Sequence, residues 1–268
     1  MTTAGGAGDT VLETRGLTRR FGGITATDQV SLKIARGARH ALIGPNGAGK
    51  TTLVNLLTGV LTPSSGTILL EGDDITRLPA HRRVARGLVR TFQINQLFGD
   101  LTPVQSLALA ASGRLGQSAG WWRPLGAGRD RRLADACDRL LGEFHLDDVM
   151  NQKVALLPYG KRRLLEIALA IACQPRVLLL DEPVAGVPEG ERQQILDTIG
   201  RLPADVTVLL IEHDMDLVFN FARTVTVLVN GAVFLEGDAR SVSNDPGVRA
   251  VYLGEAHQPQ PSRRSADG

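Results

Sequence analysis

The chain has 268 residues, of which 43% are hydrophobic and 22% are charged, a balance typical of a globular protein with a substantial core. Its formal net charge of +2 gives no electrostatic reason to expect a nucleic acid or an acidic membrane as partner. Cys137 and Cys173 are the two cysteines and lack CxxC spacing, so we expect small buried side chains of a reducing compartment, without disulfide or metal.

No apolar run approaches the roughly 18–20 residues that a membrane-spanning helix needs, so any spanning segments must come from other chains. Residues 1–10 carry no signal-peptide pattern and are expected to be a flexible N-terminus. Residues 11–43 alternate apolar and polar side chains in short runs, which predicts strands. The period then becomes helical from Lys50 to about Gly59, and residues 66–75 again predict strand, turn and strand.

The middle of the chain differs in character from its two ends. A short basic helix is expected over 80–88, followed by an edge strand ending at Gln93. Residues 98–165 are helical and amphipathic around a loop at 115–130, so we interpret them as a helical subdomain inserted into an α/β domain.

Strands and helices alternate after Gln174. "PRVLLLDEP" is a continuous apolar strand, as expected in a sheet buried on both faces. Further elements are expected as a helix at 189–201, a strand in "VTVLLIEHD", a helix at 215–222 and a hairpin turning at Asn230-Gly231. The alternation predicts an α/β fold with a parallel sheet over residues 11–255, and the polar tail 256–268 is expected to be disordered.

A phosphate-binding loop is predicted at "GPNGAGKT", which follows an expected strand and opens an expected helix. Its glycines allow backbone N–H groups to surround phosphates, Lys50 reaches the β- and γ-phosphates, and the Thr51 hydroxyl can bind Mg²⁺. We therefore predict a nucleoside triphosphate site formed by Gly44, Pro45, Asn46, Gly47, Ala48, Gly49, Lys50, Thr51 and Thr52.

Two acidic residues follow the buried strand "VLLLDEP". Asp181 lies at the carboxyl end of this strand, where α/β folds bind ligands, and is predicted to hold Mg²⁺ through water. Glu182 is the candidate general base that takes a proton from the attacking water.

With these motifs in hand, the chain resembles the ATP-binding subunits of ABC transporters over about residues 11–255. Five motifs stand in the order of that family: "GPNGAGKTT", "TFQ", "LPYGK", "LLLDEP" and "IEHD". The resemblance implies a P-loop NTPase (RecA-like) core with an antiparallel β subdomain and the inserted helical subdomain. It also implies that Tyr159 and Gly160, in the signature loop, bind the γ-phosphate of ATP on a second ATPase subunit, in trans.

The resemblance assigns three further roles. Phe21 would stack on adenine, the alternative being a buried core phenylalanine. Gln93 would approach Mg²⁺ and the attacking water, and would sense the membrane subunits. His213 would contact the γ-phosphate, while the other histidines are assigned no role.

The longer segments around these motifs are similar to one ATPase of the branched-chain amino acid transporter branch. They include "VRTFQINQLF", "YGKRRLLEIA" and the ending "VYLGEA". Trp121 and Trp122, in the "GQSAGWWRPL" insertion, are either a partner contact or loop packing.

Two positions depart from the family pattern. Pro158 replaces the usual signature serine and removes a hydroxyl donor, which predicts weaker closure on ATP. Pro188 stands where the loop after the catalytic Glu normally has Asp or Asn. A heterodimer with one weakened ATP site is therefore one interpretation, with a homodimer left open.

The function expected from these features is ATP hydrolysis that energises an importer at the cytoplasmic face of the inner membrane. Its partners would be a second ATPase subunit, two transmembrane permeases and, indirectly, a periplasmic binding protein. Branched-chain amino acids, urea, amides and aromatic acids remain open as solutes. The alternatives are a lipopolysaccharide-type exporter ATPase, a non-transport member acting on ribosomes or DNA, and a regulatory protein with vestigial hydrolysis.

Overall fold

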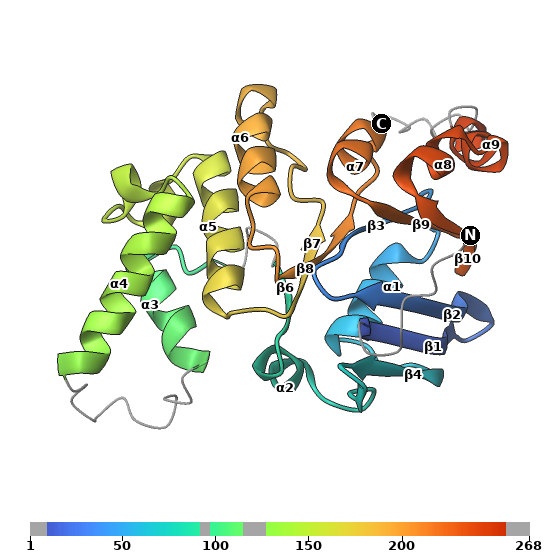
Figure 1. Ribbon diagram of the computed structural model, residues 1–268, viewed down its shortest axis with the longest axis horizontal. Helices are drawn as coiled ribbons and strands as arrows, with labels where there is room; N and C mark the ends of the chain where they lie inside the picture. The colour runs from blue at the N-terminus through green and yellow to red at the C-terminus, as the bar shows by residue number, and fades with distance from the viewer. Residues whose placement is uncertain (1–9, 92–96, 115–126, 256–268) are drawn as a thin grey trace, which may run out of the picture.

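The computed structural model describes residues 10–91, 97–114 and 127–255, which form two β-sheets and the helices around them (Figure 1). An antiparallel sheet has the strand order β2-β1-β4-β5, and a six-stranded sheet has the order β10-β9-β3-β8-β7-β6. The strands of the first sheet are β1 (Thr10–Phe21), β2 (Ile24–Ala35), β4 (Ser65–Leu70) and β5 (Asp73–Asp74). Those of the second are β3 (Arg39–Ile43), β6 (Leu88–Arg90), β7 (Val177–Asp181), β8 (Thr207–Ile211), β9 (Thr224–Val229) and β10 (Ala232–Asp238).

The helices lie on both sides of the six-stranded sheet (Figure 1). Those of the first half are α1 (Lys50–Thr58), α2 (Ala80–Ala85), α3 (Pro103–Arg114) and α4 (Ala127–Glu143), followed by the short 3₁₀ helices η2 (Asp147–Val149) and η3 (Val154–Leu156). Those of the second half are α5 (Tyr159–Ala172), α6 (Glu189–Gly200), α7 (Met215–Phe221), α8 (Ala239–Asn244) and α9 (Pro246–Glu255). Among the described residues, none of the helices has the length and apolar character needed to cross a membrane.

The central strands β3, β7 and β8 of the six-stranded sheet are buried on both faces, as the continuous apolar run of β7 predicts. In β7, Val177 and Leu179 face a core that also contains α1 and the antiparallel sheet. Leu178 and Leu180 point the other way, into a core shared with α3, α4, α5 and α6. The alternation of side chains along one strand therefore joins both layers to the sheet.

Five neighbouring strands of this sheet, β9, β3, β8, β7 and β6, are parallel. β3 pairs with β8 and β9, and β8 pairs with β7, where Asp181 lies opposite Ile211. Their carboxyl ends therefore meet at one edge, which brings together the segments that follow β3, β7 and β8.

The predicted fold class is confirmed, with an α/β core, a separate antiparallel sheet and a group of helices that contains α3 and α4. The turn between β9 and β10 falls at Asn230 and Gly231, both with positive φ as a type I′ hairpin needs. The basic helix predicted over 80–88 ends at Ala85, and β6 follows at the sheet edge. Cys137 is buried and Cys173 half-buried.

Several predictions lie outside the described residues: the flexible ends at 1–9 and 256–268, Gln93, and the pair Trp121-Trp122. The bounds of the inserted helical subdomain stay a prediction.

Candidate nucleotide site and an adjoining pocket

The predicted phosphate loop connects β3 to α1, and three of its glycines have positive φ. A Cβ at Gly44 would overlap the carbonyl oxygen of Leu228, and one at Gly49 would overlap that of Ala26. Gly47 has open space around it but a φ of 77°. Glycine is therefore required by close packing at two positions and by backbone conformation at the third.

Neighbouring segments hold this loop in place. Lys50 Nζ donates hydrogen bonds to the carbonyl oxygens of Gly44 and, at 2.9 Å, of Pro45. The backbone N–H of Gly231 donates to the Ala48 carbonyl at 3.0 Å, so the β9–β10 hairpin supports the loop from outside. Contacts within the chain, including those of Lys50, therefore hold the phosphate loop in its shape.

A cavity of about 430 Å³ lies over the loop and reaches the catalytic candidate Glu182. Backbone N–H groups at the start of α1 and the ammonium of Lys50 make this cavity suitable for phosphates. Its lining residues are Ile24, Thr25, Ala26, Asn46, Gly47, Ala48, Gly49, Lys50, Thr51, Thr52, Glu182, Asn230 and Gly231.

Asp181, at the end of β7, forms an ion pair with Arg90, whose Nη2 lies 2.5 Å from Oδ2 of Asp181. The other guanidinium nitrogen of Arg90 donates to Asn55 Oδ1 at 2.9 Å. The hydroxyl of Thr51 and the carboxylate of Asp181 are hard oxygen donors, a donor set that fits Mg²⁺. Arg90 was not singled out from the sequence, although it stands three residues before Gln93.

Glu182 has a left-handed backbone conformation, with φ at 44°. This conformation costs about 1–2 kcal/mol in a residue with a Cβ, so the surrounding structure must hold it. Its N–H donates to the Ile211 carbonyl at 2.9 Å, which ties the segment after β7 to the end of β8. Oε1 of Glu182 lies 3.4 Å from Nδ1 of the exposed His213.

A second carboxylate, that of Glu212, also lies near His213. Glu212 is 1% exposed, its Oε2 lies 3.8 Å from His213 Nδ1 and accepts a hydrogen bond from the His213 N–H at 3.2 Å. Burial raises the pKa of Glu212 above its ordinary value. The sequence shows this residue in "IEHD", but only the fold reveals that it is buried beside two site residues.

Tyr159 and Gly160 begin α5, directly after Pro158. The Tyr159 hydroxyl donates to the Ala185 carbonyl at 3.0 Å, and a Cβ on Gly160 would overlap the Glu191 carboxylate. The signature loop therefore packs against the segment after Glu182 in its own chain, and its role toward a second subunit stays a prediction.

Phe21 is 43% exposed, so the alternative of a buried core position is wrong. The Arg19 guanidinium lies 4.6 Å from the centroid of its ring. Phe21 is not part of the cavity lining, whereas Ile24, three residues on, is.

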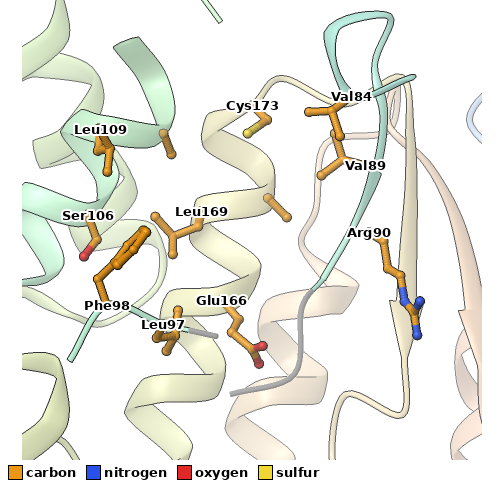
Figure 2. A pocket seen from close by; sticks show the side chains of 12 residues that line it. Val84, Val89, Arg90, Leu97, Phe98, Ser106, Leu109, Glu166, Leu169 and Cys173 are labelled. Carbon is orange, nitrogen blue, oxygen red and sulfur yellow. The ribbon is translucent and has the colours of Figure 1, made fainter. Parts of the chain in front are cut away.

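A second pocket, of about 410 Å³, lies between α3, α5 and the α2–β6 segment (Figure 2). Its lining is mostly apolar, with Phe98 and Leu169 among its side chains, but Glu166 is part of it. Burial raises the Glu166 pKa to about 7. The other lining residues are Val84, Val89, Arg90, Leu97, Ser106, Leu109, Ala110, Ala170 and Cys173.

Comparisons with known proteins agree with this geometry. The family model described as "ABC transporter" matches residues 27–185. The high-affinity branched-chain amino acid transport ATP-binding protein BraF of Pseudomonas aeruginosa is 40% identical over 251 residues, which cover 92% of this chain and 98% of BraF. LivG of Escherichia coli K12, which carries the same description, is 38% identical over 253 residues, covering 92% and 98%.

Solved structures are similar over almost the same length. The ADP conformation of MJ1267, an ATP-binding cassette of an ABC transporter, superposes with a TM-score of 0.79 at 30% identity, covering 91% of this chain and 99% of that one. A nucleotide-free ATP-binding cassette from an ABC transporter gives a TM-score of 0.78 at 31% identity, covering 91% and 98%.

Proposed function

The chain belongs to the ABC transporter family, and we propose that it is the ATP-hydrolysing subunit of an importer for branched-chain amino acids or a related small amide or acid. The observation that carries this proposal is the convergence of the phosphate loop, Asp181, Glu182 and His213 at the carboxyl ends of β3, β7 and β8. The names of BraF and LivG support the solute class, and a lipopolysaccharide-type exporter is not favoured.

The residues of this site perform the reaction mainly by positioning and charge stabilisation. Lys50 and the loop N–H groups bind the β- and γ-phosphates, and Phe21 stacks on adenine. Glu182 accepts the proton of the attacking water, and His213 orients the γ-phosphate. Mg²⁺, held by Thr51 and Asp181 with Gln93 nearby, would neutralise charge on the phosphates. In the closed pair, Tyr159 and Gly160 of one subunit complete the site of the other.

We assign the pocket of Figure 2 to a helix of a transmembrane permease subunit. Its apolar lining suits one face of an amphipathic helix, and it lies against β6, the strand that leads to Gln93. Two such permeases would hold the ATPase pair at the cytoplasmic face of the inner membrane, with a periplasmic binding protein delivering solute from outside.

Replacing the general base tests the catalytic assignment. Glu182→Gln is expected to lower steady-state ATP turnover at least a hundredfold, because the amide cannot accept the proton, while ATP binding and an ATP-dependent dimer persist. Glu143→Gln, the same change on an exposed glutamate of α4, is the control. ATP turnover in Glu182→Gln equal to that of the control would refute the assignment. Uptake of labelled leucine, compared with labelled urea, by the assembled transporter in vesicles tests the solute class.

A further inference from the structure

Two oppositely charged residues are buried one turn apart on α5. Arg163 is 6% exposed and Glu166 is 3% exposed. Nη1 of Arg163 donates to Oε2 of Glu166 at 2.6 Å. A buried ion pair of this kind is weak evidence for a role in stability alone, because the desolvation of both charges offsets much of their attraction.

The remaining donors of Arg163 reach the backbone around the catalytic base. Its Nε donates to the Pro183 carbonyl at 2.8 Å, and its Nη2 donates to the Glu182 carbonyl at 2.5 Å. These bonds hold the peptide units on the carboxyl side of Glu182, the residue whose left-handed conformation needs external support. A planar guanidinium can make all these contacts at once, which a lysine ammonium cannot.

The other end of the pair is buried at the wall of the pocket. Glu166 is part of the pocket lining and lies on the same helix as Leu169 (Figure 2). Within the described part of the chain, no hydrogen-bond donor reaches its second oxygen, Oε1. A buried carboxylate oxygen without a partner among the described residues calls for a hydrogen-bond donor.

We propose that Arg163 and Glu166 connect the pocket to the catalytic loop: Arg163 is a positioning residue for Glu182, and Glu166 Oε1 accepts a hydrogen bond from a donor side chain of the permease helix. This inference rests on the proposed function, since it takes the pocket as the permease site and Glu182 as the base. A donor in the pocket would hold the Glu166 carboxylate in one orientation. That carboxylate then orients the Arg163 guanidinium, which donates to the carbonyls of Glu182 and Pro183.

The catalytic half of the inference is tested on the full chain alone. Arg163→Lys is expected to lower kcat for ATP about tenfold with KM within twofold of the wild type, because Arg163 touches the catalytic loop and not the nucleotide. Amide hydrogen exchange over residues 182–187 should accelerate. Arg39→Lys is the matched control, since Arg39 also donates to backbone carbonyls, those of Leu202, Pro203 and Val206, far from the site.

A double variant keeps this test decisive if Arg163→Lys folds poorly. Arg163→Met with Glu166→Leu replaces the buried ion pair by apolar side chains of similar volume, a change that is often neutral for stability. It is expected to fold and still to lose about tenfold in kcat. Wild-type kcat and exchange rates in a folded variant would overturn the inference, whereas loss of turnover in Glu182→Gln would leave the proposed function standing.

The pocket half is tested on the transporter assembled with its permease subunits in lipid nanodiscs. The readout is the ratio of ATP turnover in the assembly to that of the isolated chain. Glu166→Gln presents a donor amide to the pocket, so this ratio is expected to fall about tenfold, while Glu143→Gln leaves it unchanged. An unchanged ratio in Glu166→Gln would overturn the assignment of Glu166 as the acceptor.

Discussion

Restoring a serine at position 158 separates the two contributions that a signature serine makes. Pro158 caps α5 with φ at −53° and ψ at 153°, a conformation that serine adopts without strain. The carbonyl of residue 158 continues to accept from the Arg162 N–H, as in the wild type. Pro158→Ser therefore changes the side chain and restores one N–H without moving the helix.

The expected effect on the isolated chain is close to zero. A serine cap stabilises a helix by about 1 kcal/mol, whereas loss of the proline restraint on the unfolded chain costs about 0.4–1 kcal/mol. In the ATP-bound pair, the new hydroxyl gains a hydrogen bond to a charged phosphate, worth about 1.5–3 kcal/mol. Two such sites in a homodimer, or one in a heterodimer, tighten closure about tenfold or more per site.

The measurement is ATP-dependent dimerisation by analytical ultracentrifugation in the Glu182→Gln background, together with the melting temperature without nucleotide. Pro79→Ser is the matched control, because Pro79 caps α2 with a similar backbone conformation and lies outside the nucleotide site. Tighter ATP-dependent closure with an unchanged melting temperature, and a raised ATP turnover in the otherwise wild-type chain, are expected. Closure or turnover equal to or below that of the wild type would refute the reasoning.

Three further predictions concern burial and close packing. The pKa of Glu166 is about 7 in the folded chain and 4.5 in the unfolded chain, so the unfolded chain releases this proton first as pH rises. The free energy of unfolding is therefore expected to fall between pH 4.5 and pH 7, by roughly 1.4 kcal/mol per pKa unit. Urea unfolding of Glu166→Gln should lack this dependence on pH. Burial lowers the His40 pKa to about 4, so between pH 6.5 and pH 4 the unfolded chain binds a proton that the folded chain does not. The free energy of unfolding should therefore fall as pH decreases through this range. In His40→Gln this fall should be absent. Gly44→Ala should weaken ATP binding at least tenfold by calorimetry, because its Cβ overlaps the Leu228 carbonyl oxygen. An affinity matching that of Gly200→Ala, whose Cβ meets no neighbour and whose φ is not positive, would contradict this.

The fold and the phosphate site were predictable because their signals are local. A P-loop needs a strand, a glycine-rich turn and a helix in sequence, and "GPNGAGKT" carries all three requirements within a few residues. The apolar run of β7 predicted a strand buried on both faces, and Asn230-Gly231 predicted the turn of the hairpin.

The missed residues act through contacts between distant segments. Arg90 on β6 reaches Asp181 on the neighbouring strand β7, and nothing in "VRTFQ" indicates that pairing. Glu166 did leave a signal, as a lone acid in the apolar run "LLEIALAIA", which a buried helix tolerates only with a partner. That partner is Arg163, on the same helix. The sequence could not predict which carbonyls the other donors of Arg163 reach, because this depends on how α5 packs against the segment after β7.

The two departures from the family pattern lie close together in the fold, although thirty residues separate them in sequence. Pro158 caps α5 and Pro188 caps α6, and the Tyr159 hydroxyl joins the two loops through the Ala185 carbonyl. Both prolines therefore belong to the surface that we expect to face the ATP of the partner. The phosphate loop of this chain keeps every residue that its own ATP requires. In a heterodimer, the weakened site would thus be the one on the partner's phosphate loop, and Pro158→Ser would restore that site alone.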